Sequence, residues 1–280
     1  MSRVALFLHI HRTAAVEQGL ALCDWLLHRD HEVILPASDA AALGRPDLAL
    51  ADDQVGVGAD LAVSLGGDGS MLRTVGMVAD HSVPVLGVNF GQLGYLTEIE
   101  PDAATHAIEG FLAGEHVIEQ RMRLEVAVAG GPVFHALNEV VVEKVDSGRT
   151  VRLKLDLNDD FFTTYAADGL IVSTPTGSTA YAFSARGPIV DPVHRALVLT
   201  PVAPHSLFDR SLVLSPEDEV VITVLADREA ALAVDGTIVH RLGVDDVVVC
   251  REAPAPARFV SFGGKDFHRT LKRKFGLNDR

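Results

Sequence analysis

The segment that decides the fold covers residues 61–70 and reads LAVSLGGDGS. Its first half, Leu61–Leu65, is a short apolar run, and such a run predicts a buried β-strand. The glycines that follow allow the backbone to turn sharply and to approach a ligand closely. Ser70 precedes apolar residues at helical spacing, so we expect Ser70 to cap a helix. A strand that passes through a glycine turn into a helix is typical of a parallel α/β sheet.

Similar units surround this segment. Short apolar runs at Val4–Ile10, Glu32–Leu35 and Pro84–Val88 indicate further buried strands, and Thr13–Arg29 has helical spacing. This alternation predicts that residues 1–100 form an open, mostly parallel sheet with helices on its faces. The acidic segment between Pro36 and Gly58 is rich in Ala, Gly and Asp, and we expect it to be a long mobile connection.

The pattern changes near residue 101, after which a helix is expected at about Asp102–Leu112 and most later segments look extended. The expected strands are Leu124–Val128, Val133–Glu143, Arg152–Leu157, Phe161–Ala166, Leu170–Ser173, Ala196–Leu199, Val220–Leu225, Ala230–Val234 and Val247–Cys250. Residues 101–255 are therefore predicted to form a β-rich second domain. In residues 256–280, the stretch Asp266–Phe275 places Phe267, Leu271 and Phe275 on one apolar helical stripe, which predicts a C-terminal helix docked on another element.

Composition limits the classes of partner. The 280 residues have a hydrophobic fraction of 48% and a formal charge of −14, and the two cysteines lie far apart. Two cysteines make no disulfide framework, and no signal peptide or membrane-spanning run is evident, so a cytoplasmic protein is expected. An acidic chain repels nucleic acid and anionic membranes. Any anionic substrate must therefore be held by local arginines, lysines and backbone N–H groups.

The glycine turn contains an unusual aspartate. Free N–H groups at a helix N-terminus suit phosphate, which favours a phosphate-donor site at Gly66, Gly67, Gly69 and Ser70. Asp68 would repel phosphate, so it is expected to accept a proton, bind a hydroxyl group or hold a metal. A tight turn with a helix-capping aspartate is an equal alternative. Arg73 lies one helical turn later, where its guanidinium could reach a phosphate.

Two other polar segments are candidates for a ligand site. Residues 168–184 read DGLIVSTPTGSTAYAFS, in which Thr174, Thr176, Ser178 and Thr179 cannot all be core residues. Hydroxyl groups at a strand-to-helix turn suit a ribose or an adenine edge, and an elaborate N-cap is the alternative. Asn138 and Glu139 interrupt an apolar run and should point to opposite faces of a strand. Ligand binding and a satisfied structural pair explain that interruption equally well. Asp235-Gly236 reads as a hairpin turn.

These segments together resemble the NAD kinase family. Asp168-Gly169 followed by residues 173–181 (STPTGSTAY) is similar to the family signature nearly residue for residue. Residues 86–97 (LGVNFGQLGYLT), Asn138-Glu139 and residues 204–207 (PHSL) resemble further family motifs in the expected order. The resemblance covers nearly the whole chain and is clearest from Leu61 to about Asp235.

The resemblance implies a fold and a reaction. The fold would be α/β plus β, with a Rossmann-like first domain, a β-sandwich-like second domain and a final segment that returns to the first. The reaction would transfer the γ-phosphoryl group of ATP, or of polyphosphate, to the 2′-hydroxyl of the adenosine ribose of NAD, with a divalent metal, usually Mg²⁺. A homodimer or homotetramer is implied, and Asp68 would be the proton acceptor. The implied NAD-binding residues are Asp68, Gly69, Arg73, Asn138, Glu139, Arg149, Ala166, Asp168, Thr176, Thr179, Ala180, Tyr181, Ala182, Phe183, Ser184 and Thr237.

The chain departs from the family pattern at three positions. Ser70 stands where threonine is usual, Arg186 replaces a usual glycine, and Ser211 replaces a usual proline. None of these changes removes a proposed catalytic group. Because arginine disfavours positive φ, we predict a negative φ at Arg186 and a side chain that points to solvent or to an anion. Two rival functions remain, a lipid or sugar kinase with the same turn and a nucleotide-binding regulator without catalysis.

Overall fold

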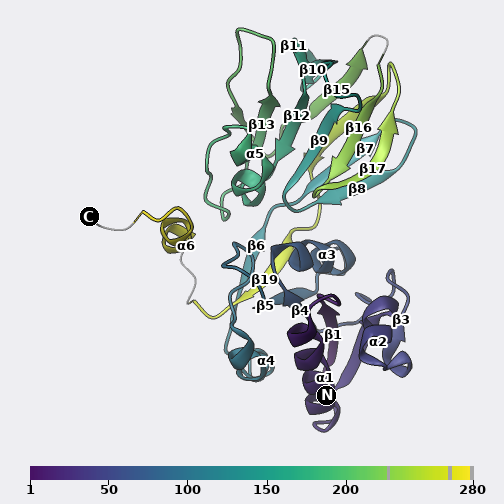
Figure 1. The fold of residues 1–280 in the computed structure, drawn as a ribbon, viewed down its shortest axis with the longest axis vertical. Coiled ribbons are helices and arrows are strands. Elements are labelled where there is room, and N and C mark those ends of the chain that lie inside the picture. The colour runs from purple at the N-terminus through teal and green to yellow at the C-terminus, as the bar shows by residue number, and fades with distance from the viewer. Residues whose placement is uncertain (226–227, 264–266, 278–280) are drawn as a thin grey trace. The chain divides into compact units, whose positions relative to one another are not determined.

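The computed structural model describes residues 1–225, 228–263 and 267–277, and it divides the chain into two compact units (Figure 1). The first unit comprises Met1–Gln120 and Ala257–Arg280, and the second comprises Arg121–Pro256. The first unit extends past the boundary expected near residue 100, because β6 (Val117–Arg121) joins its sheet. The C-terminal segment belongs to this unit because β19 (Ala257–Ser261) pairs in parallel with β5 (Pro84–Asn89).

Within the described residues, the first unit contains a seven-stranded sheet in the order β3-β2-β1-β4-β5-β19-β6. Its remaining strands are β1 (Arg3–Leu8), β2 (Glu32–Pro36), β3 (Ala49–Leu50) and β4 (Leu61–Gly66). The successive pairs from β3 to β19 are parallel. Strands β1, β4 and β5 are almost wholly buried, as expected for strands covered on both faces. The expected Rossmann-like parallel sheet is confirmed.

Helices flank this sheet. They are α1 (Thr13–Leu27), α2 (Ala37–Leu43), α3 (Asp68–Val78) and α4 (Ala104–Leu112). A further helix, α6 (Phe267–Lys274), contacts Tyr95 in the loop after β5. In α1 the buried Ala15, Leu22 and Leu26 lie on one face and pack into the core of this unit. Short 3₁₀ turns occur at Pro46–Leu48, Ala79–His81 and Pro101–Ala103. The predicted C-terminal helix is present from Phe267, whose ring contacts that of Tyr95, whereas Asp266 lies outside the described residues.

Two expectations for the first unit are wrong. The segment between Pro36 and Gly58 is not a long mobile connection, because it forms α2, a 3₁₀ turn and β3. Ala40 is fully buried, whereas Ala37, Ala41 and Ala42 are exposed. Ser70 does not cap a helix, because α3 already begins at Asp68 and Gly67 is its N-cap residue without a side-chain cap. The glycines form the helix start directly, so the helix needs no hydroxyl there.

The second unit contains two six-stranded antiparallel sheets in the described residues, in the orders β11-β10-β15-β18-β7-β8 and β14-β13-β12-β9-β16-β17. The strands of the first are β7 (Leu124–Val128), β8 (Val133–Ala136), β10 (Val151–Leu157), β11 (Asp160–Ala167), β15 (Val220–Leu225) and β18 (Val247–Glu252). The strands of the second are β9 (Glu139–Lys144), β12 (Gly169–Ser173), β13 (Leu197–Val202), β14 (Leu212–Leu214), β16 (Ala230–Val234) and β17 (Thr237–Leu242).

One apolar core joins the two sheets. Side chains of β7, β10, β15 and β18 pack with those of β9, β12, β13 and β16 in a single cluster. The predicted β-sandwich-like unit is therefore confirmed. The expected continuous strand over Val133–Glu143 is wrong, because it breaks at Leu137 and Asn138 into β8 and β9, which belong to different sheets. The edge strands β14 and β17 were not among the expected strands.

In the described residues, none of the helices combines the length and the apolar character needed to cross a membrane.

Candidate active site

The turn between β4 and α3 leaves open space around its glycines. A Cβ added at Gly67 or Gly69 would meet nothing within 4 Å, so a ligand can approach the backbone there. Gly66 has a different role, because a Cβ there would lie 2.1 Å from Ser70 Oγ. The Ser70 side chain thus packs against the strand end, while Gly67 and Gly69 present free space at the N-terminus of α3.

The Asp68 carboxylate is held by backbone N–H groups from a distant loop. Tyr95 N donates to Oδ2 at 2.8 Å and Leu96 N donates to Oδ1 at 2.9 Å. Gly94 makes this approach possible, since a Cβ there would lie 2.2 Å from Asp68 Oδ1. The carboxylate therefore has a structural partner that sequence reasoning did not foresee. Each of its oxygens still keeps a second lone-pair direction for a ligand.

A cavity of about 480 Å³ opens beside this turn, at the carboxyl end of β1. Strand β1 has β2 on one side and β4 on the other, so the chain reverses its direction of winding between β1 and β4. Open parallel sheets bind ligands at such switch points. The cavity is lined by Leu8, His9, Ile10, His11, Arg12, Ser38, Asp39, Gly67, Gly69, Ser70, Arg73 and Gly91.

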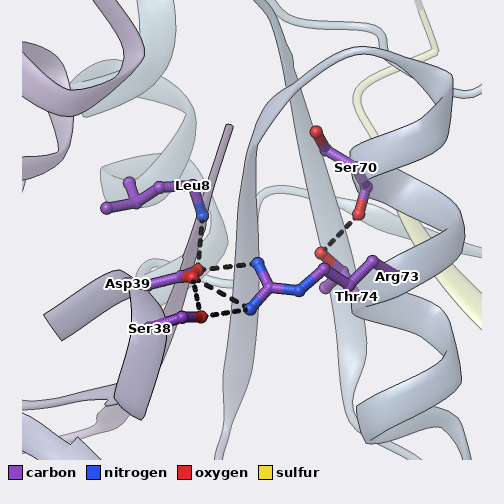
Figure 2. A network of polar contacts seen from close by, with 6 residues as sticks. All are labelled: Leu8, Ser38, Asp39, Ser70, Arg73 and Thr74. Atoms are coloured by element: carbon purple, nitrogen blue, oxygen red, sulfur yellow. Dashed lines mark hydrogen bonds and ion pairs between the residues drawn. The ribbon is translucent and has the colours of Figure 1, made fainter. Parts of the chain in front are cut away.

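A buried ion pair forms one wall of this cavity (Figure 2). The Asp39 side chain, which is 1% exposed, accepts hydrogen bonds of 2.9 Å from both terminal nitrogens of Arg73. Asp39 also accepts from Leu8 N and from the Ser38 hydroxyl, each at 2.8 Å. Arg73 was expected to reach a phosphate, but its guanidinium is held by Asp39. The neighbouring sequence gives no signal for this role of Asp39, because Leu8 and Arg73 lie 31 and 34 residues away from it.

In the second unit, the hydroxyl-rich segment forms a 3₁₀ turn (Thr176–Thr179) and α5 (Tyr181–Ser184) after β12. Thr174, Thr176 and Ser178 are buried and Thr179 is half-buried, so the four hydroxyl side chains are, as expected, not all core residues. Thr174 donates to Leu137 O at 2.6 Å, and Ser178 donates to Pro175 O at 2.6 Å. These hydroxyls mainly satisfy buried backbone groups, which makes their burial tolerable.

Three distant segments meet at Asn138. Gly177 packs so closely that an added Cβ would lie 2.0 Å from Asn138 O. The Asp235 carboxylate accepts hydrogen bonds from the backbone N–H groups of Leu137, Asn138 and Glu139 at 2.9, 2.8 and 3.2 Å. The turn at Asp235 joins β16 to β17, as its Asp-Gly sequence predicted. The neighbouring sequence did not indicate that the carboxylate would also accept these hydrogen bonds. Asn138 therefore lies at a fixed strand break, and Glu139 is the first residue of β9.

Three buried oxygen atoms near this junction have no hydrogen-bond partner in the described part of the chain. They are Glu139 Oε2, Thr176 Oγ1 and the Oγ of Ser173, which lies opposite Glu139 in the pairing of β12 with β9. Buried polar atoms normally have hydrogen-bond partners, so buried oxygen atoms without a partner beside α5 are consistent with a ligand site. Ala182 of α5 packs on Val141 and Ile171, which places this helix on the outer face of the second sheet.

The other expected residues of this unit have varied surroundings. Asp168 accepts a hydrogen bond of 2.6 Å from Lys144 Nζ, a partner that was not foreseen. Tyr181 lies near Glu139, Glu143 and Asp168, and their negative charges add to burial in raising the pKa of its hydroxyl. Thr179 and Ala180 are half-buried, whereas Tyr181, Phe183 and Ser184 are exposed. Arg149 is exposed, Ala166 lies on β11 of the other sheet, and Thr237 begins β17 beside the Asp235 turn.

The prediction for Arg186 is half wrong. Its φ is +68°, in the left-handed region, although its side chain is exposed as expected. Gly187 N donates to Ala182 O at 2.7 Å and Arg186 N donates to Phe183 O at 3.0 Å, a pattern that closes α5 with a left-handed residue. The helix end thus imposes positive φ on whatever residue stands there.

Burial raises the pKa of Glu139 from 4.5 to about 7, with the nearby Asp235 charge adding to the effect. Between pH 4.5 and 7, Glu139 keeps its proton in the folded chain but has released it in the unfolded chain. The shifted pKa therefore stabilises the folded chain fully below pH 4.5, and this stabilisation is lost as the pH rises through 7. We expect wild type to lose about 1–3 kcal/mol relative to Glu139→Gln between pH 5 and pH 8. Urea unfolding without nucleotide measures this difference. A difference independent of pH would contradict the shifted pKa.

Comparisons with known proteins identify the family. The family model described as "ATP-NAD kinase N-terminal domain" matches residues 4–116, and "ATP-NAD kinase C-terminal domain" matches residues 137–262. An NAD kinase from Heliobacterium modesticaldum is 40% identical over 280 residues, covering 98% of both chains. One from Geobacter metallireducens is 37% identical over 287 residues, with 100% of both chains covered.

Two solved structures are similar over nearly the whole chain. The yeast NADH kinase complexed with NADH has a TM-score of 0.89 at 25% identity, covering 100% of this chain and 89% of its own. An NAD kinase from Archaeoglobus fulgidus in complex with ATP has a TM-score of 0.77 at 25% identity, covering 99% of this chain and 100% of its own. The fold and these matches define a phosphotransferase that acts on a nucleotide. The chain belongs to the NAD kinase family.

Proposed function

We propose that the chain transfers the terminal phosphoryl group of ATP to the 2′-hydroxyl of the adenosine ribose of NAD, which yields NADP and ADP. The observation that carries this proposal is the β4–α3 turn. There a carboxylate held by two N–H groups stands next to two glycines with open space. Family membership supports the choice of NAD as acceptor and of ATP as donor.

In the proposed step, Asp68 orients the ribose hydroxyl and accepts its proton. The hydroxyl oxygen forms a bond to the γ-phosphorus while the bond from that phosphorus to the bridging oxygen breaks, so ADP leaves. The hydrogen bonds from Tyr95 N and Leu96 N fix the direction of the carboxylate before the substrate binds. The N–H groups at the start of α3 face the negative charge of the donor phosphates.

The second unit would supply residues that recognise NAD. The unpaired Glu139 Oε2 can accept a hydrogen bond from a ribose hydroxyl, and Thr176 Oγ1 can donate or accept one. The half-buried Asn138 and the exposed face of α5 extend this polar surface. The tight contact between Gly177 and Asn138 O would hold the two segments together as one preformed site.

Mg²⁺ fits this site as a companion of ATP more than as a resident ion. Within the described residues, no group of three or more His, Cys, Asp or Glu side chains could hold a metal. Asp39 is committed to Arg73, whereas Asp68 keeps lone pairs available. Mg²⁺ is commonly bound by substrate phosphates with one or two carboxylates, so Asp68 is the residue proposed to contact it. When bound, the ion neutralises phosphate charge.

A turnover assay with substrate competitors tests the proposal. The purified chain is incubated with MgATP and NAD, and NADP is quantified with an NADP-specific dehydrogenase while ADP is measured in parallel. We expect equal amounts of NADP and ADP, and no phosphorylation of hexose phosphates or diacylglycerol. Phosphorylation of one of those acceptors without NADP formation would favour the rival kinases. NAD binding without turnover would indicate a regulator.

A further inference from the structure

Two arginines line the cavity at the switch point between β1 and β4, but only one of them brings a net charge to it. Arg73 is paired with the buried Asp39 through both terminal nitrogens, so these two side chains together are neutral. Arg12 lines the same cavity and is exposed. In the described part of the chain, no carboxylate forms an ion pair with Arg12.

The backbone fixes where Arg12 lies. It is the residue before α1, and Arg12 N donates to His9 O at 2.9 Å, which closes the turn after β1. Its carbonyl oxygen accepts from Ala15 N at 3.0 Å, so the turn is tied to the helix start. The guanidinium extends toward Gly91, whose added Cβ would lie 3.9 Å from Arg12 Nη1. Arg12 therefore stands at the rim of the cavity with its charged end near the loop after β5.

A chain of formal charge −14 needs a local cation to hold a polyanion. The N-terminus of α3 supplies only partial charges, about half a unit in total. A guanidinium adds a full charge and a planar fork that matches phosphate oxygens. We propose that Arg12 binds the phosphate chain of the phosphoryl donor, and that Arg73, neutralised by Asp39, instead positions α2 and α3 around the cavity. This inference rests on the proposed function, because it assigns the cavity to the donor.

The test compares two variants that each remove one positive charge from the same cavity. For Arg12→Gln we expect the KM for ATP to rise about tenfold or more, with the KM for NAD within about twofold and an unchanged Tm. For Arg73→Gln we expect a lower Tm, because Asp39 is left buried without its cation, and a smaller rise in the KM for ATP. Arg29→Gln is the control, since Arg29 lies beyond the other end of α1 and pairs with Glu109.

A binding experiment compares ATP with inorganic tripolyphosphate as the source of the bound phosphate chain, and it does not depend on turnover. Calorimetry with ATP, inorganic tripolyphosphate and NAD is performed on wild type, Arg12→Gln, Arg12→Lys and Arg73→Gln. We expect the glutamine variant to lose affinity for ATP and tripolyphosphate alike, and the lysine variant to lose less. Unchanged affinity for both, or a loss confined to NAD, would overturn the assignment. A larger loss of ATP affinity in Arg73→Gln than in Arg12→Gln would also overturn it. Absence of NADP formation by wild type would defeat the proposed function, while these binding results would still decide the role of Arg12.

Discussion

Replacing Asp68 with asparagine is expected to lower the turnover number by about 10²-fold or more, because asparagine cannot accept the proton of the ribose hydroxyl. The structure adds a second consequence. Asparagine has one oxygen, so it can accept from only one of Tyr95 N and Leu96 N. We expect a modest loss of stability, on the order of 1–2 kcal/mol, and nucleotide affinity within about tenfold of wild type. Steady-state kinetics, NAD titration and thermal denaturation measure the three quantities.

Gly94→Ala provides an independent control for this prediction. The new Cβ would lie 2.2 Å from Asp68 Oδ1, so the carboxylate must move although its chemistry is unchanged. If position matters, turnover falls in this variant too. Near-normal turnover in Asp68→Asn would remove Asp68 from the catalytic role. Loss of activity together with loss of folding or of NAD binding would leave Asp68 as a structural or binding residue.

Gly177→Ala is expected to destabilise the second unit by about 3 kcal/mol or more and to abolish measurable NAD binding. The added Cβ would lie 2.0 Å from Asn138 O and 2.4 Å from its carbonyl carbon. These are backbone atoms, which the Asp235 carboxylate and Thr174 hold in place, so they cannot move away at low cost. Urea unfolding and NAD calorimetry on the purified variant give both quantities.

The matched control is Gly243→Ala in the same unit. Its added Cβ would come no closer than 3.7 Å to Asp246 Oδ2, which is ordinary van der Waals contact. We expect its stability to stay within about 0.5 kcal/mol of wild type. A Gly177→Ala variant as stable as this control would show that the segments at Asn138 and Gly177 can separate freely, and the preformed site would have to be abandoned.

The sequence alone predicted the two kinds of fold and their order along the chain. The apolar run Leu61–Leu65 and the helical spacing in α1 are local patterns. They can be recognised from contiguous residues because side chains repeat with a fixed period along a strand or a helix. The signature at residues 173–181 and the turn at Asp68 likewise identified the family from contiguous residues. The prediction of a mobile connection after Pro36 was mistaken because the alanines of α2 carry little hydrophobic signal, although Ala40 is fully buried.

The tertiary structure alone decided which polar groups are available to a ligand. Asp39 pairs with Arg73 across 34 residues, Asp68 is held by a loop 27 and 28 residues away, and Asp235 accepts from a strand break 97 residues before it. Each of these contacts depends on how strands are ordered in a sheet, and strand order is not encoded in the spacing of neighbouring residues. The same holds for Arg186, whose positive φ follows from the way α5 ends. A side chain's chemistry can be read from its residue type, but whether its charge is already neutralised depends on the partners that the fold brings to it.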